Sequence, residues 1–170
     1  MIAIFSTGGT FDKVYFDAKS EFTIGDPQAE PLLKEANISC DYVISAILKK
    51  DSLDMSDADR ALITKSIQCS PYQQIVVTHG TDGMVATAKA IIDGNPSDKT
   101  IVLVGAMQPA RMRYSDAPFN LGFAIASVQL LPAGVYIAMN GQIFTHDQLV
   151  KNQVVKNRAT ACFEATNQYR

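Results

Sequence analysis

The sequence predicts an α/β fold, namely an open, mostly parallel sheet with helices on both faces in a Rossmann-like three-layer arrangement. Short apolar, β-branched runs alternate along the chain with segments of helical periodicity. Several of these runs are apolar throughout, as in strands that are covered on both faces. No Gly/Ser-rich or Pro-rich linker divides the 170 residues, so we expect 1–170 to form a single domain, with 153–170 as a less regular C-terminal tail.

The order of the elements follows from these runs and from local end signals. Ser56 is a good N-cap, and Asp57 and Asp59 place acidic groups in the first turn that follows, where the helix dipole favours them. The segment 93–96, Asp-Gly-Asn-Pro, is typical of a helix end. Strands are expected at 2–5, 41–48, 74–78, 100–104 and 134–139, and helices at 27–37, 56–69, 84–93 and 118–131. Such alternation indicates a parallel sheet that is wound on both faces.

Composition excludes several classes of protein. Fifteen basic and 17 acidic residues give a net charge of −2, which argues against a nucleic-acid partner. No apolar run reaches the roughly 18 residues of a membrane span, so no membrane partner is expected. The chain opens without a signal-peptide pattern, and we expect a cytoplasmic location. An odd number of cysteines without a CxxC motif predicts neither a disulfide framework nor a metal site: Cys40, Cys69 and Cys162.

Polar, glycine-rich segments follow the predicted strands. In open parallel sheets, ligands bind beyond the carboxyl ends of the strands, so these segments are expected at one rim. Residues 7–10 read Thr-Gly-Gly-Thr and residues 78–83 read Thr-His-Gly-Thr-Asp-Gly. Glycines allow the backbone to turn tightly and to approach a ligand, with hydroxyl and N–H groups directed at it. Each motif alone is also compatible with an ordinary turn.

Together the two motifs predict nucleophilic chemistry. A hydroxyl nucleophile needs a neighbouring group that removes its proton, and a lysine held close by can do this. Asp82 can orient such a lysine, and Lys151 is the candidate at the far end of the sheet. His79 is compatible with either a structural or a catalytic role. No GxSxG, P-loop or GxGxxG motif is present in the sequence, which argues against the reactions that those motifs serve.

The motifs resemble those of the bacterial-type L-asparaginases. The resemblance covers most of residues 2–151 and rests on TGGT, DSLDM, THGTDG, VGAMQP, SDAPFNL and MNGQIFTHDQLVK. It matches the amino-terminal domain of that family, while the family's smaller second domain has no counterpart in this sequence. The resemblance implies a short, single-domain asparaginase that converts L-asparagine to L-aspartate and ammonia. It implies no cofactor, and it implies a homo-oligomer.

The resemblance also implies roles for individual residues. Thr10 corresponds to the nucleophile that attacks the side-chain amide of asparagine. Thr81, Asp82 and Lys151 correspond to a second threonine group that helps proton transfer, with Lys156 as the rival to Lys151. Tyr15 is the choice for the activating tyrosine of the loop after the first motif. The residues expected to bind substrate are Gly9, Asp51, Ser52, Gly80 and Ala106.

One departure from the family leaves other functions open. Leu53 stands where family members usually have glutamine, and its side chain has no hydrogen-bonding group for the substrate's α-amino group. Family members also complete each pocket with residues from a neighbouring subunit's second domain. The alternatives are therefore a module that binds asparagine or aspartate without turnover, or an amidase that prefers glutamine or a modified asparagine.

Overall fold

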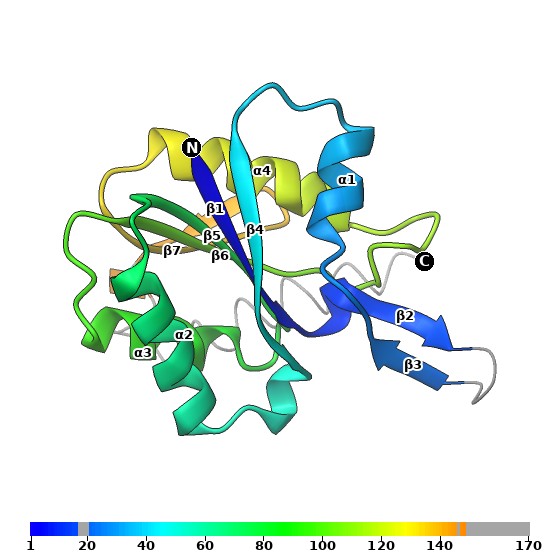
Figure 1. Ribbon diagram of the computed structural model, residues 1–170, viewed down its shortest axis with the longest axis horizontal. Coiled ribbons are helices and arrows are strands. Elements are labelled where there is room, and N and C mark those ends of the chain that lie inside the picture. The colour runs from blue at the N-terminus through cyan, green and yellow to red at the C-terminus, as the bar shows by residue number, and fades with distance from the viewer. Residues whose placement is uncertain (17–20, 146, 149–170) are drawn as a thin grey trace.

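A six-stranded sheet forms the centre of the computed structural model, which describes residues 1–16, 21–145 and 147–148 (Figure 1). Its strand order is β4-β1-β5-β6-β7-β8, with β8 antiparallel and the others parallel. The strands are β1 (Ile2–Gly8), β4 (Tyr42–Lys50), β5 (Gln74–Thr78), β6 (Thr100–Val104), β7 (Gly134–Met139) and β8 (Gln142–Phe144). The predicted fold class is confirmed.

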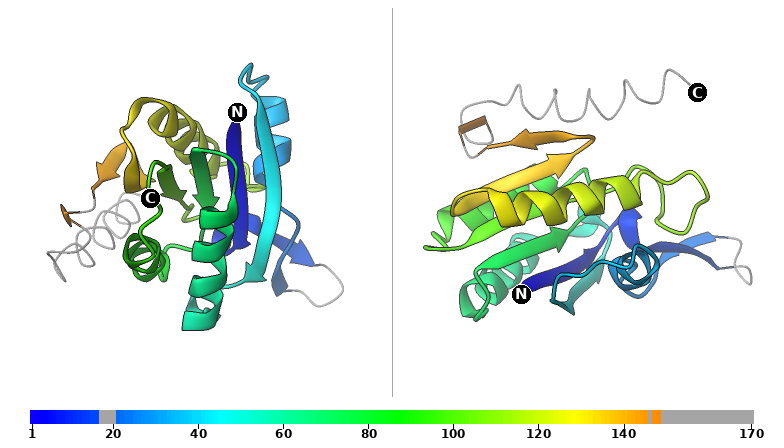
Figure 2. Two further views of the ribbon diagram at one scale, coloured as in Figure 1. Left: turned by 60° about the vertical axis from the view of Figure 1, so that its left-hand side comes forward. Right: turned by 90° about the horizontal axis from the view of Figure 1, so that it is seen from above.

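Helices cover both faces of this sheet. Figures 1 and 2 show α1 and α4 on one face and α2 and α3 side by side on the other. Their bounds are α1 (Ala29–Glu35), α2 (Asp57–Cys69), α3 (Met84–Asp93) and α4 (Ala117–Leu130). Each lies within three residues of its predicted ends. None of these helices combines the length and apolar character that a bilayer crossing requires.

The crossover through α4 differs in hand from the other crossovers. The chain steps from β5 to β6 and from β6 to β7 in the same direction across the sheet, yet α3 and α4 lie on opposite faces (Figure 2). The two crossovers therefore have opposite hands. About 98% of such parallel crossovers are right-handed, so this sheet contains one connection of the rarer kind.

The core lies in the central strands. Ile4, Val76 and Val102 are fully buried and sit in register across β1, β5 and β6. Their burial on both sides of the sheet explains the continuous apolar runs of the sequence. Ser56 caps α2 with a reciprocal capping box to Asp59, and α3 ends at Asp93, both as predicted.

Two strand features were not predicted. A two-stranded antiparallel hairpin, β2 (Lys13–Phe16) and β3 (Glu21–Ile24), projects from the end of β1. The short antiparallel β8 extends the sheet beyond β7. Strands of three or four residues that mix polar and apolar side chains carry little periodicity, so neither stood out in the sequence. β1 and β4 also run past their apolar residues, because pairing continues to Gly8 and Lys50.

The topology places a switch point between β1 and β5. From β1 the chain moves to β4 on one side, and from β4 it returns to β5 on the other side of β1. Ligands of open α/β sheets bind outside the carboxyl ends of the strands at such a point. The segments after β1, β4 and β5 are therefore the first place to look for a site.

Candidate active site

The loops that follow β1 and β5 are in direct contact. A Cβ atom on Gly9 would lie closer than 3.0 Å to the backbone N and Cα of Gly80, and Gly9 has a φ of +73°. Thr7 Oγ1 donates a hydrogen bond of 2.9 Å to the carbonyl oxygen of Thr78. Both the positive φ and the close approach favour glycine. The predicted convergence of the two threonine-glycine motifs is thus present, with Gly9 and Gly80 at the point of contact.

Thr10 begins a short 3-10 turn, η1 (Thr10–Asp12), directly after Gly9. Phe11, the next residue, is fully buried and anchors the turn in the core. Thr10 itself is only partly buried. Among the described residues, its hydroxyl has no hydrogen-bond partner. The turn therefore presents a partly exposed threonine whose hydroxyl is not bonded to any described group.

Ser52 lies against the same glycine of the β5 loop. It starts a second 3-10 turn, η3 (Ser52–Asp54), and is 2% exposed. A Cβ atom on Gly80 would lie 2.7 Å from the Ser52 Cβ. The Ser52 Oγ is buried without a hydrogen-bond partner in the described part of the chain. A buried hydroxyl without a partner costs folding free energy, and a ligand at this site can restore the missing bond.

The residues on either side of Ser52 differ in character. Asp51 forms a 2.8 Å ion pair with Lys13 and accepts a 3.2 Å hydrogen bond from the backbone N of Leu53. The hydrogen bond from Lys13 holds the pKa of the Asp51 carboxyl below its usual range. Leu53 is 76% exposed. Asp51 thus fixes the turn, and Leu53 places an exposed apolar side chain beside Ser52.

The loop after β6 borders the β5 loop. A Cβ atom on Gly105 would lie 2.7 Å from the His79 carbonyl oxygen and 3.2 Å from Thr81 Cγ2. The next residue, Ala106, is buried. The Asp116 carboxylate accepts hydrogen bonds from the backbone N–H groups of Met107 and Gln108, at 3.0–3.1 Å. One side chain therefore holds the backbone around Ala106 in a fixed loop.

Asn120 links this loop to the end of β7. Its Nδ2 donates to the carbonyl oxygen of Gly105 and to Asp116 Oδ2, each at 3.0 Å. Its Oδ1 accepts a hydrogen bond of 3.0 Å from the backbone N of Asn140. Asn120 is fully buried on the first turns of α4. The segments after β6 and β7 are therefore tied together through one amide.

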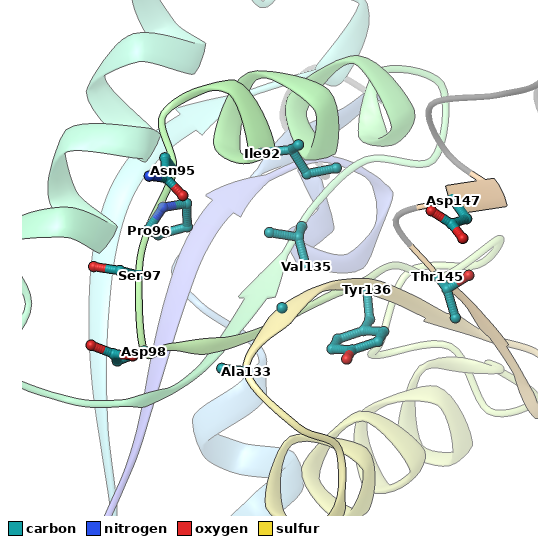
Figure 3. Close-up of a pocket in the computed structure, with 11 residues that line it drawn as sticks. Ile92, Asn95, Pro96, Ser97, Asp98, Ala133, Val135, Tyr136, Thr145 and Asp147 are labelled. Carbon is teal, nitrogen blue, oxygen red and sulfur yellow. The ribbon is translucent and has the colours of Figure 1, made fainter.

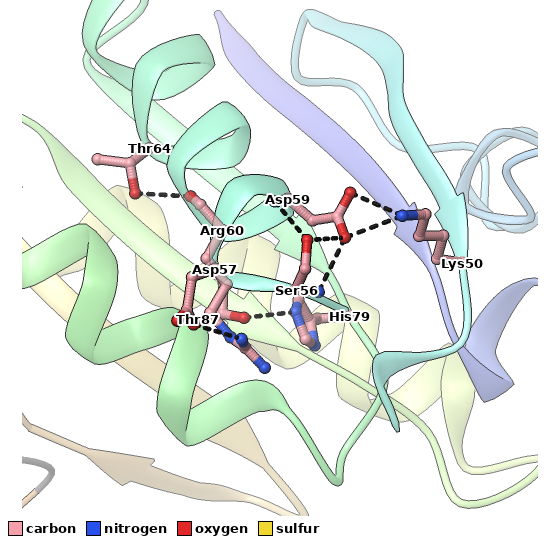
Figure 4. A network of polar contacts seen from close by, with 8 residues as sticks. All are labelled: Lys50, Ser56, Asp57, Asp59, Arg60, Thr64, His79 and Thr87. Atoms are coloured by element: carbon pink, nitrogen blue, oxygen red, sulfur yellow. Dashed lines mark hydrogen bonds and ion pairs between the residues drawn. The ribbon is translucent and has the colours of Figure 1, made fainter. Parts of the chain in front are cut away.

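His79 has a structural role. Its Nδ1 donates to the Gly80 carbonyl oxygen at 2.7 Å. Its Nε2 accepts from Thr87 Oγ1 at 2.8 Å (Figure 4). Full burial lowers the pKa of His79 to about 4, so the ring is neutral at physiological pH. With both nitrogens occupied, the imidazole holds the β5 loop onto α3. Of the two roles that the sequence left open, the structure supports this one.

A surface network attaches the start of α2 to the end of β4 (Figure 4). Lys50 Nζ lies 2.9 Å from both carboxylate oxygens of Asp59. The hydrogen bond from Lys50 lowers the pKa of Asp59 to about 2. Asp59 also accepts hydrogen bonds from the backbone N and the hydroxyl of Ser56. Asp59 therefore links the last residue of β4 to the N-cap of α2, and so fixes the η3 turn between them.

The remaining predicted residues are placed as follows. Thr81 is partly buried and Asp82 is exposed, both directly after the Gly80 contact. Tyr15 lies on the hairpin strand β2, is 54% exposed and packs edge-on against Phe22, with 5.5 Å between ring centroids. Lys151 and Lys156 lie outside the described residues. The meeting of a lysine with Thr10 therefore stays a prediction.

Sequence reasoning missed three polar residues that shape the site: the buried Asp12 and Asn120 and the partly buried Asp116. Two of them had a signal, because Asp12 follows the first motif by two residues and Asp116 comes directly before the α4 helix. Within the described ranges, no group of three or more His, Cys, Asp or Glu side chains is arranged to hold a metal ion.

Comparison with known proteins agrees with this arrangement. A family model described as "Asparaginase, N-terminal" matches residues 1–170. L-asparaginase 2 of Escherichia coli (strain K12) is 32% identical over 98% of this chain and 49% of its own length. The probable periplasmic L-asparaginase of Haemophilus influenzae is 32% identical over 94% of this chain and 47% of its own length.

A solved structure extends the comparison to three dimensions. The probable cytoplasmic L-asparaginase of Campylobacter jejuni superposes with a TM-score of 0.69 at 34% identity, over 85% of this chain and 47% of that one. The chain spans about half the length of the curated relatives it matches. Its motifs, its fold and the family match over its whole length agree, and the chain belongs to the asparaginase family.

Proposed function

We propose that this protein hydrolyses the side-chain amide of L-asparagine to L-aspartate and ammonia, with Thr10 as the nucleophile. The observation that carries the proposal is the contact between Gly9 and Gly80, because it brings the turn that bears Thr10 against the loop that bears Thr81 and Asp82. The uncommitted hydroxyl of Thr10 and the unpartnered hydroxyl of Ser52 lie on turns that both adjoin this contact.

The proposed reaction is an acyl transfer in two steps. Thr10 Oγ attacks the amide carbon, and its proton passes to the group formed by Thr81, Asp82 and Lys151. Backbone N–H groups of the loop near Thr81 stabilise the negative charge on the amide oxygen. The C–N bond breaks as the amide nitrogen takes up a proton and leaves as ammonia. Water then hydrolyses the ester on Thr10 and releases aspartate.

Substrate binding is assigned to the groups around Ser52. Its buried hydroxyl is suited to a carboxylate oxygen, since a bound acceptor removes the cost of leaving the hydroxyl unpaired. Asp51 contributes by holding the turn through Lys13 and the Leu53 N–H. Gly9, Gly80 and Ala106 offer backbone groups at close range because they carry small side chains or none.

A second candidate is an amidase that prefers glutamine or a modified asparagine. Leu53 favours it, because a 76% exposed leucine stands beside the serine that is assigned to the substrate. One extra methylene in a substrate changes discrimination by only about 1–3 kcal/mol, so the two amides need a direct comparison. The ratio of kcat/KM for asparagine to that for glutamine decides between the candidates, and we expect asparagine to be preferred.

The test of the nucleophile is the Thr10→Ala variant. We expect it to fold as the wild type does and to release ammonia from asparagine at least about 10³-fold more slowly, as when a covalent nucleophile is removed. Thr64→Ala is the matched control, since it removes a threonine hydroxyl on α2 that bonds only the Arg60 carbonyl. Near wild-type turnover in Thr10→Ala excludes Thr10 as the nucleophile. Tight binding of asparagine by the wild type without ammonia release identifies a binding module.

Location and assembly complete the proposal. We assign the protein to the cytoplasm, in line with the name of its Campylobacter jejuni neighbour, although the Haemophilus influenzae relative is named periplasmic. We also expect copies of the chain to associate. Phe119 and Leu130 on α4 support this, because they are 62% and 84% exposed and no charged residue occurs in α4.

A further inference from the structure

Asp12 places a buried carboxylate in the same turn as Thr10. Its side chain is fully buried, and Oδ2 accepts a 2.6 Å hydrogen bond from Ser6 Oγ on β1. Oδ1 accepts a 2.8 Å hydrogen bond from the backbone N of Gln28, just before α1. The Asp12 carbonyl oxygen accepts a further 2.8 Å bond from the backbone N of Gly25. One residue thus joins the turn to a central strand and to the segment before α1.

The turn is also held through its backbone, because Gly9 N donates to the Lys50 carbonyl oxygen at 2.9 Å and the Lys13 N–H donates to the Thr10 carbonyl oxygen. Gly8 and Gly9 precede it with φ values of +99° and +73°, and glycine backbones have wide conformational freedom. Within the turn, Asp12 N donates to the Gly9 carbonyl oxygen at a long 3.2 Å. The Thr10 side chain contributes no hydrogen bond to any described residue. Within the turn, the side chains that anchor Thr10 are therefore those of its neighbours Phe11 and Asp12.

A carboxyl group at this position carries a cost. Burial raises the pKa of Asp12 above its ordinary value, against the lowering effect of its hydrogen bonds to Gln28 and Ser6. An apolar side chain in the same space avoids the cost of burying a carboxylate. What an apolar residue cannot supply is two directed acceptor oxygens that hold two different elements. The buried Asp12 carboxyl is therefore best explained by the two elements that it holds in place, and not by a gain in folding stability.

The same network reaches the loop after β6. Gln28 is 3% exposed, and its Oε1 accepts a 2.8 Å hydrogen bond from Arg111 Nε. Ala110 N donates a 3.2 Å hydrogen bond to the Phe11 carbonyl oxygen. The turn that bears Thr10 is thereby connected to β1, to the start of α1 and to the loop that contains Ala106.

We propose that Asp12 is a positioning residue, which sets the orientation of Thr10 for attack by fixing the 3-10 turn to Ser6 and Gln28. The inference rests on the proposed function for its catalytic consequence. Asp12 touches no reacting atom. Of the groups assigned to substrate binding, Ser52 and Gly80 lie outside its network, whereas Gly9 and the loop of Ala106 are joined to it through backbone hydrogen bonds. Loss of Asp12 therefore affects the chemical step more than the binding of substrate.

The experiment compares Asp12→Ala, Asp12→Asn and Ser6→Ala with Thr100→Val in the full chain. Thr100→Val is the matched control, because it also removes a buried hydroxyl, one that bonds the Leu131 carbonyl at the opposite end of the sheet. We expect kcat to fall about 10- to 100-fold in Asp12→Ala with KM within threefold, the size of effect that a misplacement of about 1 Å produces. Asp12→Asn should fall between Asp12→Ala and the wild type, since the Ser6 hydroxyl can reverse and accept from an amide.

Two outcomes overturn the proposal. The first is wild-type kcat in Asp12→Ala and Ser6→Ala, and the second is a loss of kcat in Thr100→Val as large as in Ser6→Ala. If Asp12→Ala fails to fold, Asp12→Asn and Ser6→Ala give the answer on the same criteria.

A second readout separates this inference from the proposed function. Three-bond NMR couplings to the Thr10 γ-methyl carbon report its χ1 angle without any substrate. We expect one rotamer in the wild type and in Thr100→Val, and averaging in Ser6→Ala and Asp12→Ala. That result with no asparagine hydrolysis supports the positioning role and removes the proposed function. If the wild type hydrolyses asparagine but Ser6→Ala and Asp12→Ala keep wild-type couplings and wild-type kcat, the proposed function is supported and the positioning role of Asp12 is excluded.

Discussion

The two ends of the parallel sheet differ in whether their polar side chains have hydrogen-bond partners. Within the described ranges, four buried side-chain atoms have no hydrogen-bond partner, and three belong to residues at or just beyond the carboxyl ends of strands: Ser52 Oγ, Thr78 Oγ1 and Asn140 Nδ2. The fourth, Arg60 Nε, lies in the first turn of α2, the helix that begins at the same rim. Unsatisfied buried groups are uncommon and costly in native proteins, so their collection at one rim needs an explanation.

The amino end of the sheet has the opposite character. Lys99 Nζ donates to the carbonyl oxygens of Ser70 and Tyr72, at 2.7 and 2.9 Å. Tyr136 and Thr100 donate to the carbonyl oxygens of Pro132 and Leu131. A pocket of about 580 Å³ opens here, between the α3–β6 loop and the residues around Tyr136 (Figure 3). Its wall brings together turn residues and apolar side chains such as Ile92 and Val135.

The difference teaches that a cavity does not by itself mark the reactive site, since a pocket of about 560 Å³ also lies beside the loop after β6. The amino end offers a hollow, and among its lining side chains the Tyr136 hydroxyl already donates a hydrogen bond to the Pro132 carbonyl oxygen. The carboxyl end offers close backbone contacts and, within the described part of the chain, a Thr10 hydroxyl without a partner and buried hydroxyls that a ligand can satisfy. Because catalysis depends on groups that are free to interact with the substrate, the carboxyl end is the stronger candidate.

Among the variants that test this contrast between the two ends, the largest effect is expected from adding a methyl group at the carboxyl rim. In Gly80→Ala, the new Cβ would lie 2.7 Å from the Ser52 Cβ and would displace the η3 turn. We expect kcat/KM for asparagine to fall at least about 10²-fold, a typical cost of misplacing a positioned group. Gly122→Ala is the control, since a Cβ there meets nothing within 4 Å, and we expect about 0.5–1 kcal/mol of added stability with unchanged activity. Equal activity in Gly80→Ala and Gly122→Ala would contradict the placement of the active site at the carboxyl end of the sheet.

An intermediate effect is expected from the neutral imidazole at the rim. The folded-state pKa of His79 is about 4, below the ordinary 6.5, so between these values the unfolded chain binds a proton that the folded protein does not. Stability is therefore lost as pH falls from 7.5 to 4.5, by about 2–3 kcal/mol from this group. Urea unfolding at the two pH values, for the wild type and His79→Asn, measures it. The variant should lack this part of the pH dependence, and an identical slope in both proteins contradicts the assignment.

The smallest effect is expected at the amino end. Tyr136→Phe removes one hydroxyl, which bonds the Pro132 carbonyl at 3.2 Å beside the large pocket. We expect a loss of about 0.5–1.5 kcal/mol in the free energy of unfolding and activity within twofold of the wild type. Chemical denaturation and an ammonia-release assay check the two parts. A large loss of activity would place function at the amino end and reverse the comparison.

Sequence predicted the sheet well because its central strands are buried on both faces. The apolar runs around Val76 and Val102 match β5 and β6 residue by residue, and the run around Ile4 marks the first half of β1. The strand order and the hand of the crossover through α4 were not predicted, since they depend on contacts between segments far apart in the chain.

The candidate site was predictable where a motif carries its own geometry. Gly9 and Gly80 could be paired in advance because each follows a strand and is flanked by threonine. Asp12 could not be assigned, because its role depends on Ser6 and on Gln28, which lies 16 residues further along the chain. Asp116 was missed for the same reason: its place before α4 is visible in the sequence, but its bonds to the Met107 and Gln108 N–H groups and to Asn120 Nδ2 depend on the folded loop.

The unusual hand of the α4 crossover limits how this domain can be re-engineered. A βαβ unit transplanted from a regular doubly wound protein would carry its helix across the face that α2 and α3 already occupy. The Asp116 carboxylate would then no longer accept hydrogen bonds from the Met107 and Gln108 N–H groups, and the loop that contains Ala106 would lose these restraints. Chimeras of this domain should therefore exchange β6, α4 and β7 together with the loop between them, or leave all of these segments intact.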